Sequence, residues 1–171
     1  MRWTGRRMRV FTPIFCTVFL SDCASKRVAV ATLSPPHVPH DVLGDVLRFT
    51  LAYNDKAAMG LHVGAQSRWI LTAIAITMLT GVAIWLRRTT TRSGLTLAAA
   101  ALVAGGALGN LVDRLRWDRG VVDFIDVGLG SARFFIFNVA DVAVLLGAVL
   151  LSYAMEQEAR RARCNDSPLT A

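Results

Sequence analysis

The stretch GGALGNLVDRLRWDRGVVDFIDVGLGSARFFIFNVAD, residues 105–141, decides the fold. Two apolar segments are joined by a short polar segment, and aspartates lie at both edges of that joint. Asp113 ends the first apolar segment, Asp123 lies between the two, and Asp141 lies inside the second. A carboxylate at the margin of a hydrophobic segment is costly unless it has a partner or a function. These acids are therefore the first candidates for a functional site.

The composition indicates a membrane protein. Of the 171 residues 54% are hydrophobic, and the mean hydropathy of +0.45 is high for a soluble chain of this size. A net charge of +7 can indicate a nucleic-acid partner, but here the arginines alternate with the apolar runs. The clusters are Arg2, Arg6, Arg7 and Arg9, then Arg87, Arg88 and Arg92, then Arg160, Arg161 and Arg163. This positive-inside pattern predicts that both termini are cytoplasmic, and it excludes a nucleic-acid binder.

The apolar runs predict one membrane domain over residues 1–171. The expected spans are about 8–33, 69–87, 94–112 and 134–155, the outer loops 34–68 and 114–133, and the basic tails 1–7 and 156–171. Alternation of apolar and polar residues over 46–53 predicts a half-buried strand. The expected fold class is thus an all-α membrane protein with four transmembrane helices and a small β-sheet and loop element on its outer, periplasmic side.

The first apolar run has two readings. A basic start, an apolar run and the sequence Leu20-Ser21-Asp22-Cys23 are similar to a cleaved signal. An acid is disfavoured just before such a cysteine, and three further spans follow, so a transmembrane helix is the better interpretation. Asp22 and Lys26 are four residues apart, which predicts an ion pair on one helix face. His37 and His40 have no acidic or cysteine partners at ligand spacing, so we expect no metal there.

The expected topology brings the polar residues of the spans to one depth, just under the outer surface. These residues are Asp22, Lys26, Asn110, Asp113, Asn138 and Asp141. If the carboxyls of Asp123 and Asp141 meet in a low-dielectric site, they share one proton. Such a pair can act as the acid and the base that activate water against a peptide carbonyl. Alternatively, the acids form structural ion pairs with Arg114 and Arg116. Asp118 and Asp126 are expected to be solvated loop charges.

Five sequence blocks, in order, resemble the bacterial lipoprotein signal peptidases (signal peptidase II). They are Asp22-Cys23-Ala24-Ser25-Lys26, Asn54-Asp55-Lys56-Ala57-Ala58-Met59-Gly60, the segment from Gly106 to Arg114, Val121-Val122-Asp123-Phe124-Ile125 and Phe137-Asn138-Val139-Ala140-Asp141. Each block alone is a weak signal, but five in order with four expected spans are specific. The family's pattern is changed at Lys56, which replaces a glycine, at Met59, which replaces a phenylalanine, and at Phe135-Ile136, which stands where a proline is usual.

The resemblance implies an aspartic endopeptidase that removes the signal peptide of diacylglyceryl-modified prolipoproteins just before the lipidated cysteine. It implies that Asp123 and Asp141 are catalytic. It also implies that the substrate site is lined or braced by Asn54, Asn110, Asp113, Arg114, Asn138 and Ala140, with Asp22 and Lys26 in support. No metal or organic cofactor is expected, and globomycin should inhibit. The chain would be a monomer among the lipids of the bacterial inner membrane, with its site near the outer face.

Two other functions fit some of the same residues. A small proton- or ion-coupled transporter subunit would also carry buried acids, but a relay needs ionisable groups through the whole membrane depth. Away from the basic clusters, the inner halves of the expected spans have none. A catalytically inactive membrane scaffold would keep the fold, but the presence of both Asp123 and Asp141 argues against it.

Overall fold

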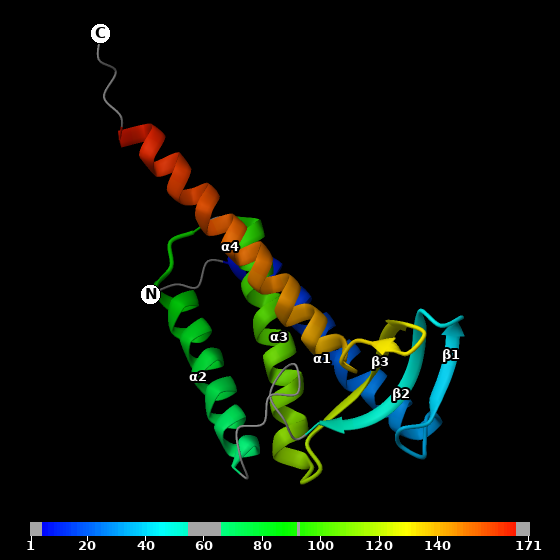
Figure 1. Ribbon diagram of the computed structural model, residues 1–171. Helices are drawn as coiled ribbons and strands as arrows, with labels where there is room; N and C mark the ends of the chain where they lie inside the picture. The colour runs from blue at the N-terminus through cyan, green and yellow to red at the C-terminus, as the bar shows by residue number, and fades with distance from the viewer. Residues whose placement is uncertain (1–4, 55–65, 92, 167–171) are drawn as a thin grey trace.

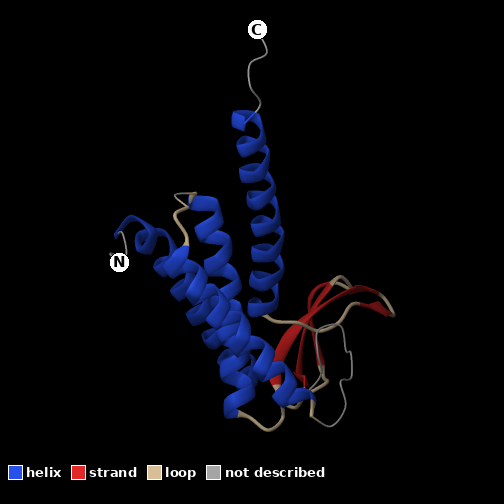
Figure 2. Ribbon diagram, turned by 90° about the vertical axis from the view of Figure 1, so that its left-hand side faces the viewer, coloured by secondary structure: helices blue, strands red, loops and turns tan. Residues whose placement is uncertain are grey.

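The computed structural model describes residues 5–54, 66–91 and 93–166. In chain order, the elements are α1 (Gly5–Thr32), β1 (Pro39–Leu43), β2 (Leu47–Asn54), α2 (Ser67–Arg88), α3 (Gly94–Arg116), β3 (Val121–Leu129), β4 (Ala132–Arg133) and α4 (Val139–Asp166). The helices pack together, and the antiparallel sheet lies at one end of them (Figures 1 and 2). Helix α4 extends past the other helices at the end far from the sheet (Figure 1).

Helix α3 is the core of the helical layer. It is 67% buried across its most apolar stretch, against 11% for α2 and 22% for α4. Among the described residues, three helices are long and apolar enough to cross a membrane, namely α2, α3 and α4 as far as Arg161. Helix α1 is not one of them, because charged residues such as Asp22 and Lys26 interrupt its apolar sequence.

Glycines let the backbones of neighbouring helices approach α3 closely, as the sequence predicts. A Cβ atom on Gly105 would lie 3.0 Å from the Phe15 carbonyl oxygen of α1. A Cβ atom on Gly106 would collide with the Ala140 carbonyl oxygen of α4 and lie 2.9 Å from Val144. Larger residues here would push α1 and α4 away from α3.

Gly106→Ala is expected to lower the free energy of unfolding by about 1–3 kcal/mol, the usual cost of overpacking. The obstacle is backbone, which cannot rotate away as a side chain can. Gly81→Ala in α2 is the matched control, since nothing lies within 4 Å of a Cβ atom there. It should be neutral or slightly stabilising. Denaturant unfolding of both variants in one detergent checks this, and equal midpoints would contradict it.

The sheet confirms the strand predicted over 46–53 and adds three strands that the sequence did not predict. The strand order is β1-β2-β3-β4. Strands β2 and β3 are antiparallel, with Ala52 opposite Asp123 and Asn54 opposite Val121. Leu51, Val122 and Phe124 form a buried cluster with the end of α1. This cluster seats the sheet on the helices and fixes β3, which carries Asp123.

Helix α4 begins at Val139, five residues later than the fourth span expected from residue 134. The chain before it stays extended, because the Phe134 amide donates to the Val127 carbonyl at 2.8 Å and the Ile125 amide to the Phe137 carbonyl at 2.8 Å. Asp141 therefore lies in the first turn of α4, nearer to the sheet than a start at residue 134 would place it.

The expectation that Asp126 is a solvated loop charge is wrong. Asp126 lies in β3 and is only 7% exposed. Its carboxylate pairs with Arg133 at 2.8 Å and accepts a hydrogen bond from the Thr50 hydroxyl at 3.0 Å. It therefore ties β2, β3 and β4 together. Asp118, by contrast, has a fully exposed side chain that pairs with Arg68 at the surface.

Candidate active site

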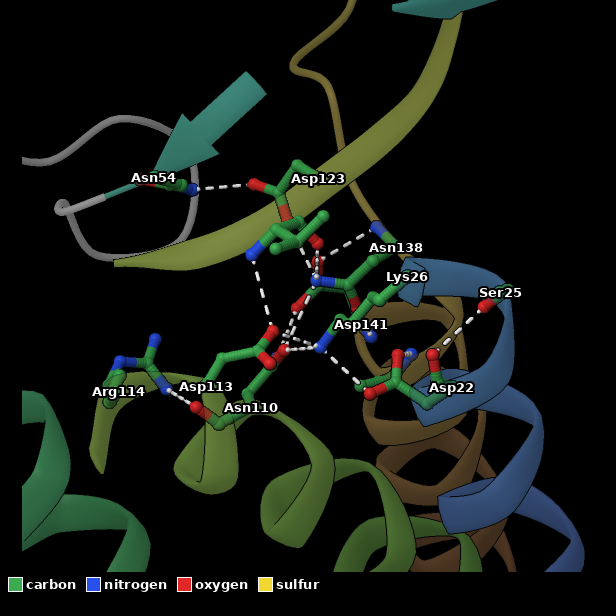
Figure 3. A network of polar contacts seen from close by, with 12 residues as sticks. Asp22, Ser25, Lys26, Asn54, Asn110, Asp113, Arg114, Asp123, Asn138 and Asp141 are labelled. Carbon is green, nitrogen blue, oxygen red and sulfur yellow. Dashed lines mark hydrogen bonds and ion pairs between the residues drawn. The ribbon is translucent and has the colours of Figure 1, made fainter. Parts of the chain in front are cut away.

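The site lies where the sheet meets α1, α3 and the start of α4 (Figure 3). Four elements supply its acids: α1 carries Asp22, α3 Asp113, β3 Asp123 and α4 Asp141. The polar residues predicted from the sequence gather here, namely Asp22, Lys26, Asn54, Asn110, Asp113, Arg114, Asp123, Asn138 and Asp141 (Figure 3). The polar residues that the sequence places near one another therefore lie together in the structure.

Asp123 is buried, with 2% of its surface exposed. Its carboxylate accepts hydrogen bonds from the side-chain amides of Asn138 at 2.6 Å and Asn54 at 2.9 Å. Burial, and after it the negative charge of Asp141, raise the pKa of Asp123 from 3.8 to about 7, although the two amides act in the opposite direction. Asp123 therefore holds its proton below about pH 7 and loses it as the pH rises through that value.

Asn138 and Asp141 cap helix α4 reciprocally. The Asp141 amide donates to the Asn138 side-chain oxygen at 3.0 Å, and the Asn138 amide donates to the Asp141 carboxylate at 3.1 Å. This is a capping box, in which each side chain satisfies an unpaired amide at the start of the helix. The Asp141 carboxylate therefore lies at the start of α4, where it accepts from a backbone amide. The two acids thus have unlike surroundings.

Hydrogen bonds connect the two acids through a pair of asparagines. The Asn138 side-chain amide donates both to Asp123 and, at 3.1 Å, to the Asn110 side-chain oxygen. The Asn110 amide in turn donates to the Asp141 carboxylate at 2.8 Å. Since amides cannot ionise, they fix the orientation of both carboxyls without taking or giving a proton.

Lys26 lies near this pair in a buried ionic cluster. Its ammonium is 2.8 Å from the Asp22 carboxylate, as the sequence predicts, and 3.0 Å from that of Asp113. Asp22 also accepts a hydrogen bond from the Ala140 amide at 2.9 Å, and Asp113 accepts one from the Val122 amide at 3.2 Å. Ala140 precedes Asp141 and Val122 precedes Asp123, so the cluster holds the backbone beside each acid of the pair.

Arg114 lies at the edge of the network (Figure 3). It donates to the Asn110 carbonyl oxygen at 3.4 Å, and its charge interacts at longer range with Asp141 and Asp123. Across residues 5–54, 66–91 and 93–166, neither Arg114 nor Arg116 forms an ion pair with an aspartate. The acids of the site are therefore not the structural arginine bridges that the alternative reading requires.

Sequence reasoning missed the role of Gly109 in the site. A Cβ atom on Gly109 would collide with the carboxylate of Asp22, so glycine makes room for the ionic cluster. The position of Gly109 directly before Asn110 was the feature of the sequence that could have indicated this role. Lys56 and Met59, the two departures in the second block, lie outside the described residues.

The fold and the site together define a class: a helical membrane protein with a buried aspartate in its sheet, linked through asparagines to a half-buried aspartate at the start of a helix. The comparisons agree with this class. The sequence model of the family described as signal peptidase (SPase) II matches residues 14–156. The chain belongs to the signal peptidase II family, and it is a membrane protease.

Individual relatives cover most of the chain. The lipoprotein signal peptidase of Mycobacterium avium (strain 104) is 35% identical over 173 residues, which span 95% of this chain and 90% of the relative. That of Coxiella burnetii (strain RSA 493 / Nine Mile phase I) is 40% identical over 137 residues, 78% of this chain and 82% of the relative. A solved bacterial membrane enzyme superposes with a TM-score of 0.78 at 26% identity, covering 94% of this chain and 93% of its own.

Proposed function

We propose that the chain cleaves the signal peptide from diacylglyceryl-modified prolipoproteins immediately before the lipidated cysteine, with Asp123 and Asp141 as the catalytic pair. The observation that carries the proposal is the buried link between the two acids through Asn138, with the pKa of Asp123 near 7. Membership of the signal peptidase II family supports the substrate class. No metal or organic cofactor takes part in the proposed reaction.

The unlike surroundings of the acids assign their roles. Asp141, at the positive end of α4, is the carboxylate that takes a proton from water as the water oxygen bonds to the scissile carbonyl carbon. Asp123 gives its proton to the carbonyl oxygen. When the C–N bond breaks, the proton on Asp141 passes to the leaving nitrogen and the hydroxyl proton of the intermediate returns to Asp123. The pair is then back in its starting state, with one proton.

We further propose four spans in the bacterial inner membrane, with both termini cytoplasmic and a monomeric chain. Helix α1 runs beside α3 in the same direction, since Phe15 is next to Gly105 and Lys26 is next to Asp113. Because α1 packs along α3 over this length, we infer that α1 is the fourth span despite its charged residues. The positive-inside rule then places the sheet and the aspartate pair at the outer face.

This depth suits a lipidated substrate. The acyl chains of a diacylglyceryl cysteine stay in the outer leaflet, so the scissile bond lies just below the headgroups. The sheet and the residue after it present apolar side chains at the same end of the molecule, where Leu43 is 65%, Leu129 70% and Phe134 60% exposed. Exposed apolar surface of this kind fits contact with lipid. The substrate therefore reaches the acids without its lipid leaving the membrane.

The test is cleavage by purified chain in lipid nanodiscs. A diacylglyceryl-modified prolipoprotein should be cut at the bond before the modified cysteine, as identified by mass spectrometry of both products. The same precursor without the lipid is the control, and it should be cut far more slowly. Intact lipidated precursor after prolonged incubation would overturn the proposal in favour of an inactive scaffold. Equal cutting of both precursors would overturn the lipid requirement.

A further inference from the structure

Arg119 lies in the short segment between α3 and β3 and contacts two aromatic rings. Its guanidinium carbon is 4.0 Å from the ring centre of Tyr53 and 4.9 Å from that of Trp117. Arg119 is exposed and has no carboxylate partner within the part of the chain that the structure describes. Its contacts are therefore of the cation–π kind, which stabilise even exposed pairs.

These contacts lie at the point where the β2–β3 ladder ends. Tyr53 pairs with Val122 and Asn54 with Val121, and β3 begins at Val121. Terminal pairs of a ladder open most easily, because each has a neighbouring pair on one side only. Arg119 is one residue from Gly120, where the chain enters β3, and it reaches across to the last residues of β2. It therefore closes the end of the ladder.

Asn54 lies in the last pair of this ladder, next to Tyr53. Side chains alternate between the two faces of a strand, so Tyr53 and Asn54 point to opposite faces. Asn54 shares the face of Asp123, to which it donates at 2.9 Å, and Tyr53 meets Arg119 on the other face. The contact of Tyr53 with Arg119 is thus on one face of β2, and the hydrogen bond from Asn54 to Asp123 is on the opposite face.

Resting on the proposed function, we propose that Arg119 is a positioning residue: its contacts with Tyr53 and Trp117 hold the end of β2 so that Asn54 presents its amide to Asp123. Arg119 itself touches neither acid. Arg116 offers a natural comparison, because its guanidinium is 4.9 Å from the same Trp117 ring but makes no described contact with Tyr53.

The groups around Asp123 determine whether its pKa rises or falls when Asn54 moves away. Burial, and after it the charge of Asp141 on α4, raise the pKa of Asp123, whereas the amides of Asn54 and Asn138 and the charge of Lys26 on α1 lower it. Asp113 and Arg114 on α3 are also near, Asp113 through its bond to Val122 and Arg114 through its longer-range charge. If Asn54 moves away, the carboxylate loses a donor, so the pKa of Asp123 rises.

The experiment compares Arg119→Ala with Arg116→Ala in nanodiscs, using a diacylglyceryl-modified prolipoprotein. Arg119→Ala is expected to lower kcat about threefold to tenfold with KM nearly unchanged. The alkaline limb of its pH profile should move up by about half a unit, in the same direction as in Asn54→Ala. Arg119→Lys should recover part of the loss, and Arg116→Ala should match the parent in all three quantities.

A second readout does not need activity. Infrared titration of the Asp123 carboxyl, assigned by its loss in Asp123→Asn, should show a higher pKa in Arg119→Ala than in the parent. An unchanged pKa, or a rise in KM with an unmoved pH profile, would overturn the inference even if cleavage is normal. Failure of the parent to cleave would overturn the proposed function instead, and the infrared titration would still decide the role of Arg119.

Discussion

Asp123→Asn and Asp141→Asn are each expected to lower kcat for the lipidated precursor by about 10²- to 10⁴-fold, the usual contribution of a general acid or base. Asparagine has the shape of aspartate but can neither hold the proton that Asp123 gives nor accept the one that Asp141 takes. Single-turnover cleavage separates this loss from slow product release. Thermal unfolding in parallel checks that each variant is folded.

The control for these variants is Asp118→Asn. The Asp118 side chain is fully exposed, and an exposed ion pair contributes little to stability. It should cleave like the parent. Asp126→Asn is unsuitable as a control, because Asp126 is buried and bonded to Arg133 and Thr50. Parent-like rates in Asp123→Asn or Asp141→Asn would remove that residue from the catalytic pair.

The same pair predicts how activity varies with pH. The pKa of Asp123 is raised to about 7, so the shared proton is present below that pH and is lost as pH rises through it. Activity that requires one proton on the pair should therefore decline above about pH 7. A profile of kcat/KM against pH for the parent shows this limb.

Lys26→Met should have the largest effect on stability. The variant leaves the carboxylates of Asp22 and Asp113 buried without their cation, and breaking a buried ion pair in this way costs about 3–5 kcal/mol. Methionine fills similar volume, so the loss measures charge and not a cavity. Cleavage should fall as well, because the cluster holds the backbone beside both acids. Denaturant unfolding gives the free energy.

Arg27→Met is the matched control, since Arg27 is the next residue of α1 but is exposed and lies outside the cluster. It should unfold like the parent. The double variant Lys26→Met with Asp22→Asn should regain part of the stability, because one uncompensated charge is gone while the amide oxygen can still accept from Ala140. No recovery, or equal loss in Arg27→Met, would contradict the role assigned to the cluster.

Local patterns in the sequence predicted several parts of this structure correctly. Alternation over 46–53 predicted strand β2, and the four-residue spacing of Asp22 and Lys26 predicted their ion pair. Such features depend on neighbours along one element, so the period of the sequence reveals them. The arginine clusters gave the orientation of the helices, and the rise per residue gave the position of each polar residue along its helix. Together they predicted that these residues lie near one another.

The parts that were missed depend on contacts distant in sequence. Strand β3 was expected as an outer loop, because its two aspartates interrupt the apolar alternation and its backbone partners, β2, β4 and the segment before α4, are distant in sequence or not evident from it. The late start of α4 follows from bonds between residues 134–137 and β3. One local signal was available: Asn138 and Asp141 have capping-box spacing, which marks a helix beginning at Val139.

The two proposed catalytic acids come from different layers of the molecule. Asp123 belongs to the sheet and Asp141 to the helical bundle, and they are linked only after the sheet has seated on α1 and Asn138 has bonded to both. Neither layer alone contains the pair. The pair therefore exists only where the sheet and the helical bundle are assembled together.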